Sequence, residues 1–228
     1  MAKLIITIDG PAASGKSTVA RLLAEKLDAS FLDTGAMYRA VTLAAMQAGI
    51  DMSDEKQLVS VLNKYKFQFE DREGKMAVSL DGDDVTEQIR NPDVTANVRY
   101  IASSAKMREK LVLQQRQFAE NAEKIVTEGR DQGTVAFPDA DIKFFLTADK
   151  RERARRRQAE LSLGDGENLD KIQKALEDRD KSDQTRSVGP LKPASDAIVI
   201  DTTDLSIEEV VEKLTNYVKQ RCLRNLSF

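Results

Sequence analysis

The sequence of 228 residues contains no histidine, and this absence narrows its chemistry. A Ser-His-Asp triad, a histidine-bound zinc ion and an imidazole general base all need this side chain, so the chain can build none of them. Cysteine is almost absent too, because Cys222 is the only one. A single cysteine excludes an internal disulfide framework and a Cys-based metal site, and it fits a reducing cytoplasm.

The sequence also lacks an excess of positive charge and any long hydrophobic run. Its 35 Lys and Arg residues against 38 Asp and Glu give a net charge of −3, so no overall field attracts nucleic acid. The first apolar run, Leu4–Ile8, ends at Asp9-Gly10, whereas a membrane span needs about 20 apolar residues. We therefore expect a cytoplasmic protein that binds neither nucleic acid nor a membrane.

What the sequence does contain is an alternation of buried strands and amphipathic helices. Leu4–Ile8 is a continuous β-branched run, typical of a strand that is covered on both faces of a parallel sheet, and Lys16–Leu27 follows with helical spacing. Further strands are predicted at 31–32, 125–126, 142–146 and 197–200, and further helices at 37–48, 94–121 and, after a Ser206/Glu209 capping box, 207–218. The predicted fold class is α/β with a parallel sheet of about five strands.

Two pieces interrupt this alternation and are not expected to belong to the core. The first, at about 50–95, alternates apolar and polar residues over 65–69 and again over 76–80, on either side of a turn at 71–74. This pattern predicts a half-exposed β-hairpin. The second piece, at about 150–190, is highly charged.

A phosphate-binding pattern joins the first strand to the first helix. Gly10-Pro11-Ala12-Ala13-Ser14-Gly15-Lys16-Ser17 matches G-x-x-x-x-G-K-[ST] in the context that the motif requires. In such a loop the backbone amides surround a phosphate, Lys16 places a positive charge at the β- and γ-phosphates, and Ser17 binds Mg²⁺. An ordinary glycine-rich turn is the alternative, but all the fixed positions and both flanking elements favour a P-loop NTPase core.

The phosphate loop alone does not distinguish kinases from motors, transporters and nucleotide switches. A GTP-binding switch should carry N-K-x-D, but Asn63-Lys64-Tyr65-Lys66 lacks the Asp and Asp180-Lys181-Ser182-Asp183 lacks the Asn. This absence weakens the switch interpretation. The second ligand must therefore decide the function.

Two polar segments follow predicted strands. They are Asp33-Thr34-Gly35-Ala36-Met37-Tyr38-Arg39 and Gly129-Arg130-Asp131-Gln132-Gly133-Thr134. Ligands bind at the carboxyl edge of such sheets, so an arginine and a carboxylate from each segment should converge beside the phosphate loop. Arg39 and Arg130 are suited to an acceptor phosphate, and Asp33 and Asp131 to a base amine or sugar hydroxyls.

Together with the later segment Asp183-Gln184-Thr185-Arg186-Ser187-Val188-Gly189-Pro190-Leu191, these motifs resemble the signature segments of bacterial cytidylate kinases. The resemblance runs over nearly the whole chain. It implies transfer of the γ-phosphoryl group of ATP to CMP or dCMP, with Mg²⁺. We expect a monomer. It also implies one kinase domain with a core at 1–36, 97–150 and 190–228, a CMP-binding insert with a β-hairpin at about 37–96, and a small lid with the following acceptor-binding segment at about 151–189.

The candidate site residues follow from the motifs and from this resemblance. Contacts with the acceptor are expected from Asp33, Thr34, Arg39, Arg108, Arg130, Asp131, Asp183 and Arg186. Catalytic roles are expected for Lys16, Arg130, Asp131 and Arg179. ATP binding is expected from Gly10, Pro11, Ala12, Ala13, Ser14, Gly15, Lys16, Ser17, Thr18, Arg153 and Arg157, with Ser17 as the metal ligand.

Several of these residues have a structural alternative. Asp33 could serve only as a helix N-cap, and Arg108 could be a solvated helix residue. Asp183 and Arg186 lie in a run so charged that a solvated surface would be the default interpretation.

The sequence departs from the family pattern at two positions. Arg99 stands where the family usually carries Ser, which bears on base selectivity, and Gln132 stands where Ile or Met is common. We expect the Gln132 side chain to point away from the ligand. A kinase for another small acceptor such as UMP or shikimate, and a non-catalytic P-loop switch, remain as alternatives.

The basic run at 150–157 places Arg153, Arg156 and Arg157 on one helical face. Binding to nucleic acid would favour interleaved aromatic residues, and none occurs between Phe145 and Tyr217. A lid is the better interpretation, with 162–166 as its flexible tip. Closure of a lid would bring arginines over the polyphosphate and exclude water.

Overall fold

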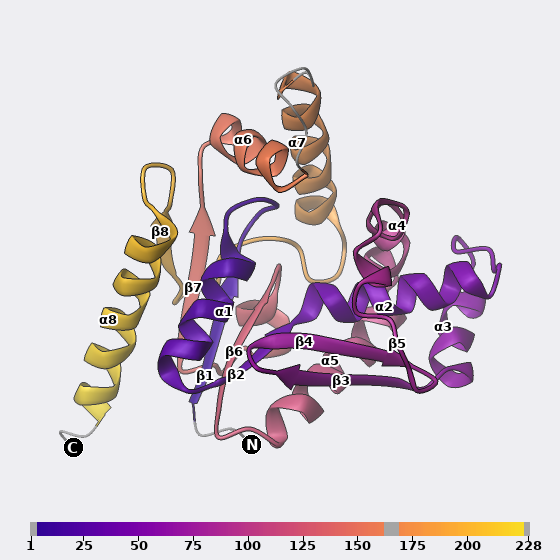
Figure 1. Cartoon of the computed structure of the whole chain (residues 1–228), viewed down its shortest axis with the longest axis horizontal. Coiled ribbons are helices and arrows are strands. Elements are labelled where there is room, and N and C mark those ends of the chain that lie inside the picture. The colour runs from indigo at the N-terminus through magenta and orange to yellow at the C-terminus, as the bar shows by residue number, and fades with distance from the viewer. Residues whose placement is uncertain (1–3, 162–168, 226–228) are drawn as a thin grey trace.

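The computed structural model of the chain describes residues 4–161 and 169–225. Five parallel strands form one sheet in the order β2-β6-β1-β7-β8, and three antiparallel strands form a smaller sheet, β3-β4-β5. Figure 1 shows the two sheets side by side, with helices around them. The predicted α/β class with about five parallel strands is confirmed.

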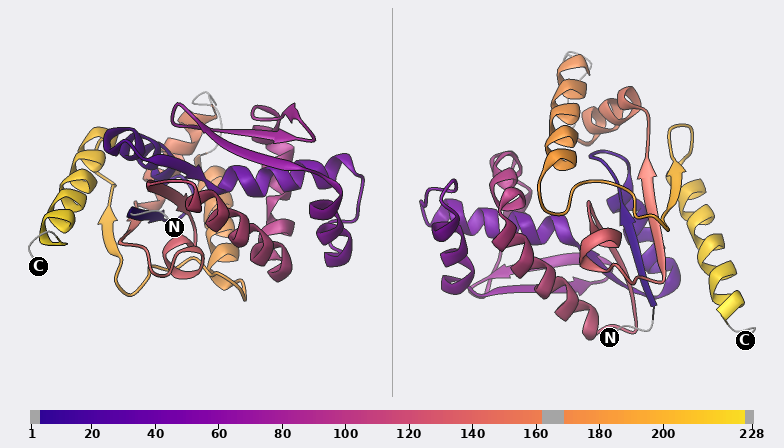
Figure 2. Two further views of the ribbon diagram at one scale, coloured as in Figure 1. Left: turned by 90° about the horizontal axis from the view of Figure 1, so that it is seen from below. Right: turned by 180° about the vertical axis from the view of Figure 1, so that it is seen from behind.

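The main sheet is covered by helices on both faces. Its strands are β1 (Leu4–Asp9), β2 (Ser30–Asp33), β6 (Lys124–Gly129), β7 (Ile142–Thr147) and β8 (Ile198–Asp201). On one face α1 (Lys16–Leu27) and α8 (Ile207–Asn225) share a buried cluster with the strands. On the other face α2 (Thr34–Gln47) and α5 (Ala105–Glu120) pack in a second cluster, and Figure 2 shows α8 at the end of the molecule opposite to α3.

Two helices differ from the sequence prediction because of capping side chains. α2 begins three residues before the predicted Met37, because Asp33 accepts a hydrogen bond from the Ala36 amide at 2.9 Å and so caps the helix. The predicted single helix at 94–121 is two helices, α4 (Pro92–Ser103) and α5. Ser104 has an extended backbone between them, and its hydroxyl accepts from the Met107 amide.

The predicted hairpin is confirmed as β3 (Phe67–Arg72) and β4 (Lys75–Leu80), followed by β5 (Asp83–Asp84) and η1 (Gln88–Arg90). It is preceded by a helix that was not predicted, α3 (Glu55–Lys64). The expectation that this piece lies outside the core is wrong for one face of the hairpin, because Met76, Val78 and Leu80 are buried in the same cluster as α2 and α5. The hairpin also contacts the sheet through Asp71, which accepts from the Phe31 amide at 2.6 Å.

Above the carboxyl edge of the main sheet, α6 (Lys150–Glu160) packs against α7 (Leu169–Thr185). The sequence indicated α6, whereas α7 was not predicted. The expected flexible tip at 162–166 lies outside the described residues. In the described ranges no helix is long and apolar enough to cross a membrane.

Candidate active site

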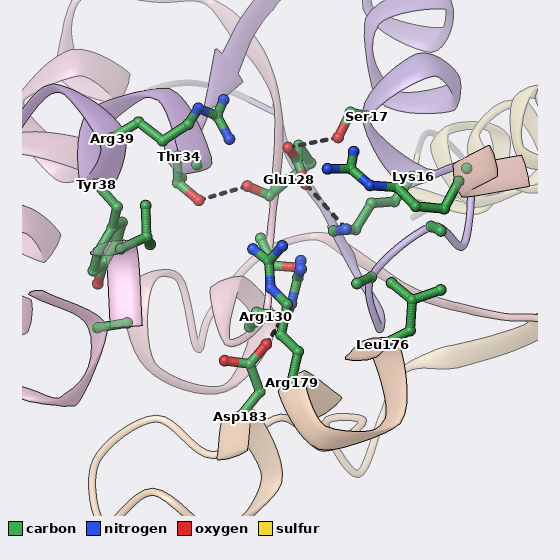
Figure 3. Close-up of a pocket in the computed structure, with 18 of the residues that line it drawn as sticks. Lys16, Ser17, Thr34, Tyr38, Arg39, Glu128, Arg130, Leu176, Arg179 and Asp183 are labelled. Atoms are coloured by element: carbon green, nitrogen blue, oxygen red, sulfur yellow. Dashed lines mark hydrogen bonds and ion pairs between the residues drawn. The ribbon is translucent and has the colours of Figure 1, made fainter. Parts of the chain in front are cut away.

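A cavity of about 460 Å³ lies at the carboxyl ends of β1, β2 and β6, and residues of α6 and α7 also line it (Figure 3). It brings together the phosphate loop, the segment after β2, the segment after β6, and residues of α4, α5, α6 and α7. The sequence prediction that these segments converge is confirmed. The cavity contains Ala12, Ala13, Gly15, Lys16, Ser17, Thr18, Thr34, Arg39, Arg108, Arg130, Asp131, Arg157, Arg179, Asp183 and Arg186 among its lining residues.

The phosphate loop has the geometry that its glycines allow. Gly15 has a positive φ of 83° just before α1, a conformation that side chains disfavour. At Gly10 a Cβ atom would lie 2.2 Å from the Leu146 carbonyl oxygen, so any side chain would push the loop away from β7. These two positions keep the backbone amides of the loop close to the cavity floor.

Lys16 is buried within this loop. Its Nζ donates to the Pro11 carbonyl oxygen at 3.3 Å and lies 3.9 Å from the Glu128 carboxylate. Burial, together with the charge of Arg130, lowers the pKa of Lys16 to about 8. An anionic ligand would therefore strongly stabilise the protonated form of Lys16.

Glu128, at the end of β6, was not singled out from the sequence. It accepts a hydrogen bond from Ser17 Oγ at 2.8 Å, and burial raises the pKa of its carboxyl group. Its backbone oxygen accepts from Thr34 Oγ1 at 2.7 Å, so Glu128 contacts both sides of the cavity. The sequence does show a carboxylate at the end of an apolar strand. That this carboxylate lies at the phosphate loop could not be predicted, because it depends on the pairing of β6 with β1.

Asp33 and Arg39 contact one another at the start of α2. The Arg39 guanidinium donates to Asp33 at 3.1 Å, while Asp33 also caps the helix. The capping role proposed as an alternative for Asp33 is therefore confirmed. Arg39 lines the cavity, but Asp33 does not.

Five charged residues form a network in the acceptor half of the cavity. Arg108 donates to the Asp131 carboxylate, and Arg186 lies 3.7 Å from Asp131 and 3.3 Å from Asp183. Arg130 Nε donates to Asp183 at 2.9 Å. Each carboxylate thus faces two arginines, and the network joins α5, α7 and the turn that follows β6.

The solvated alternatives for this network are wrong. The side chain of Arg108 is only 4% exposed, and those of Arg186 and Asp183 are 9% and 16% exposed. Because these charges are already desolvated in the folded protein, an ionic ligand that pairs with them meets little further desolvation cost on the protein side. The arrangement therefore suits a ligand with both an anionic group and hydrogen-bonding groups.

Two cationic side chains reach the cavity from α6 and α7. Arg157 pairs with Glu160 at 2.9 Å, and both line the cavity. Arg179 makes no ion pair with any described residue, and burial together with Arg130 lowers the pKa of Arg179, which still remains charged at neutral pH. Lys16 and Arg179 approach the same space between the phosphate loop and α7 (Figure 3), and Arg157 lines the same cavity.

The structure does not bring Arg153 to the cavity. This residue is buried between α6, α7 and the phosphate loop, where it pairs with Asp180 at 2.5 Å. The sequence correctly predicted that Arg153 and Arg157 share one helical face. They lie one turn apart on α6, however, and only Arg157 reaches the cavity, whereas Arg153 is in the buried interior.

An apolar wall of the cavity was also missed from the sequence. It consists of Val98 and Ala102 from α4 with Tyr38 from α2, whose ring lies 5.5 Å from the Arg108 guanidinium carbon. A flat, partly apolar ring system would fit such a wall. A buried tyrosine inside a helix gives no sequence signal that separates it from an ordinary core residue.

The two positions that depart from the family pattern, 132 and 99, have different surroundings. Gln132 is buried behind the cavity, where it accepts from Thr127 Oγ1 at 3.0 Å and donates to Gln115, so its side chain points away from the cavity as predicted. The Arg99 guanidinium lies 5.0 Å from the centre of the Tyr100 ring. It lines a neighbouring cavity of about 410 Å³ between α4 and α7.

Comparisons with known proteins agree with this geometry. A sequence model of the family described as "Cytidylate kinase" matches residues 6–220. The "Cytidylate kinase" of Limosilactobacillus reuteri (strain DSM 20016) is 49% identical over 95% of this chain and 96% of that protein, and the one of Bacillus cereus (strain ATCC 10987 / NRS 248) is 45% identical over the same shares. A solved gluconokinase from Sinorhizobium meliloti 1021 shares the fold, with a TM-score of 0.52 and 13% identity over 99% of this chain and 98% of that chain.

Proposed function

The chain belongs to the cytidylate kinase family, and from this we propose how its cavity phosphorylates CMP and dCMP. The enzyme transfers the γ-phosphoryl group of ATP to CMP, and a non-catalytic switch is not favoured. One observation supports the mechanism above all. The phosphate loop and the network of arginines and carboxylates line the same cavity, which suits two nucleotides that meet end to end.

The donor half of our mechanism consists of residues 10–18 and Arg157. Backbone amides of the loop would bind the phosphates of ATP, with Lys16 at the β- and γ-phosphates. Arg157 and Arg179 would offset the charge that spreads over the transferring group. All three cations line the same cavity, and Arg179 makes no ion pair with any described residue, which supports this assignment.

Mg²⁺ is also part of the proposal. Ser17 Oγ and the Glu128 carboxylate, 2.8 Å apart at the phosphate loop, are the oxygen donors that this hard cation prefers. The described residues contain no group of three or more His, Cys, Asp or Glu side chains that could hold a metal. This suits a cation that keeps one or two protein ligands and otherwise binds phosphates and water, and that neutralises phosphate charge when bound.

The acceptor half consists of Thr34, Arg39 and the buried network. Arg39 and Arg130 would bind the CMP phosphate, and the base would lie against Tyr38 with Arg108 and Asp131 at its edge. By the family resemblance, Asp183 and Arg186 would bind the sugar. The acceptor phosphate is already an anion, so no strong base is needed and the absence of histidine is no obstacle.

We propose the same division of labour for the segments. Residues 37–96 would act as the acceptor insert, and 151–189 as a lid with the following acceptor segment. The separate sheet of the insert and the position of α6 and α7 over the cavity support this division. The predictions of a cytoplasmic monomer that binds no nucleic acid stay predictions.

The test is a coupled assay of ADP release with CMP, dCMP, UMP, AMP and shikimate as acceptors. We expect CMP and dCMP to give the highest kcat/KM. The Lys16→Ala variant, which should fold normally but lose orders of magnitude in turnover, controls for contaminating kinases. A higher kcat/KM with UMP or shikimate would overturn the assignment of the acceptor.

A further inference from the structure

The phosphate loop has a second set of partners outside the cavity. Asp180 of α7 accepts a hydrogen bond from the Ala12 amide at 3.1 Å, and Arg153 of α6 donates to the Ala12 carbonyl oxygen at 3.1 Å. Arg153 and Asp180 also pair with each other at 2.5 Å. Both backbone polar groups of one loop residue are thus bound by one buried ion pair.

The contact is apolar as well as ionic. Ala12 belongs to a small buried cluster with Ala154 of α6 and Leu176 of α7. The side chains of Arg153 and Asp180 are 6% and 9% exposed, so the pair is shielded from water. The tip of the phosphate loop is therefore packed against both helices and does not stand free in the cavity.

Each helix carries a cavity arginine close to this contact. Arg157 lies one turn beyond Arg153 on α6, and Arg179 directly precedes Asp180 on α7. Fixing Ala12 to both helices fixes the distance between the loop amides and these two guanidinium groups. A shift of about 1 Å in such a constellation can cost up to a hundredfold in rate.

We propose that Arg153 and Asp180 are positioning residues that hold the tip of the phosphate loop in register with Arg157 and Arg179. The proposal rests on the proposed function, because the register matters only if the loop and these arginines bind the same polyphosphate. The pair acts through the Ala12 backbone and does not itself touch a substrate. A buried ion pair adds little net stability compared with apolar side chains of similar volume, so positioning explains its presence better than stability does.

The test replaces both charges together. In Arg153→Met/Asp180→Leu no buried charge is left without a partner, so the melting temperature should stay near that of the wild type. The released loop should lower kcat/KM for ATP about ten- to a hundredfold, while KM for CMP changes little. Arg155→Met, the same change on the exposed side of α6, is the matched control and should leave both constants unchanged.

A double variant with wild-type kcat/KM for ATP would overturn the proposal. If the double variant unfolds, Asp180→Asn supplies the answer: its amide oxygen still accepts from the Ala12 amide, so we expect kcat/KM for ATP near the wild-type value, and a loss of about tenfold or more at an unchanged melting temperature would overturn the proposal. An equal loss towards ATP and CMP together with a lower melting temperature would show that the pair only holds the fold. Titration with ATP in the absence of acceptor measures directly how well the phosphate loop binds ATP. If the wild-type protein binds ATP but phosphorylates no acceptor, the proposed function is refuted, while the effect of the double variant on ATP affinity still tests this proposal.

Discussion

At the scale of single residues, the cavity is lined by more cationic than anionic side chains. Lys16 and Arg179 are both buried near Arg130, and burial followed by the charge of Arg130 lowers the pKa of both. The free energy stored in this arrangement is released when a polyphosphate enters. The titration of Lys16 should therefore be visible in ATP binding.

We expect ATP affinity to fall as the pH rises above about 8. The free enzyme then loses the Lys16 proton, whereas bound phosphate raises the pKa and favours the charged form. Calorimetry at pH 8–9 in two buffers with different ionisation enthalpies should show uptake of a proton on ATP binding. In Lys16→Arg the side chain stays charged throughout, so proton uptake should vanish. Equal affinity across this range with no proton uptake would contradict the assignment.

Arg130→Lys should weaken CMP binding far more than ATP binding. The guanidinium holds Asp183 through Nε and the Gly129 carbonyl oxygen through Nη1, and a single ammonium group cannot keep both contacts while it binds a phosphate. We expect KM for CMP to rise about tenfold or more, measured at saturating ATP. If KM for ATP rises by the same factor, Arg130 supports the fold of the cavity and not the acceptor.

At the scale of elements, Asp9 connects the end of β1 to the turn that carries Arg130 and Asp131. Its two carboxylate oxygens accept from the Gln132 and Gly133 amides, each at 2.8 Å. Burial raises the pKa of Asp9 to about 7 despite these bonds. One carboxylate therefore links the strand before the phosphate loop to the acceptor turn.

This raised pKa predicts a pH-dependent stability. A carboxyl group whose pKa is higher in the folded state stabilises the fold at low pH, and this contribution is lost as the pH rises from about 4 to about 7. Across that range the free energy of unfolding of the wild type should fall by about 4 kcal/mol relative to Asp9→Asn. Urea unfolding of both proteins at several pH values measures the difference. A constant difference would mean that the two amide bonds keep the pKa of Asp9 near its ordinary value.

The elements that could be predicted from the sequence were those whose signals are local. The Ser206/Glu209 capping box has the reciprocal bonds it predicts, at 2.8 and 3.2 Å. The break at Ser104 was missed because a serine inside a helical pattern has several outcomes, and only tertiary contact selects the cap. α7 was missed although Leu169, Ile172 and Leu176 have helical spacing, because its charge suggested a solvated segment.

At the scale of the whole molecule, the site shows the same difference between features with a local sequence signal and features that depend on tertiary contacts. The phosphate loop is contiguous and was predicted in full, whereas the acceptor network joins residues from distant segments and needed the family resemblance. Glu128 was missed because its role depends on which strand lies beside β1. Arg153 was placed on the correct helical face, but the sequence does not show where a cavity ends.

The insert and the core share one hydrophobic cluster, so the molecule should unfold as a unit. Met76 of the hairpin is 2% exposed and packs in the cluster that contains α2 and α5. Met76→Ala should lower the free energy of unfolding by about 2–5 kcal/mol. Guanidinium unfolding followed by far-UV circular dichroism and by tyrosine fluorescence should give coincident curves for wild type and variant. Two separated transitions would show instead that the insert melts independently.

The strand order also determines when this sheet can form during synthesis. β1 leaves the ribosome long before both of its neighbours, since Leu4 pairs with Lys124 of β6 and Ile6 with Ile142 of β7. At typical elongation rates the apolar strand waits roughly ten seconds for a partner. Such long-range parallel pairing is slow to form and leaves an aggregation-prone segment exposed. The strand that positions the phosphate loop therefore depends on protection until β6 and β7 have been made.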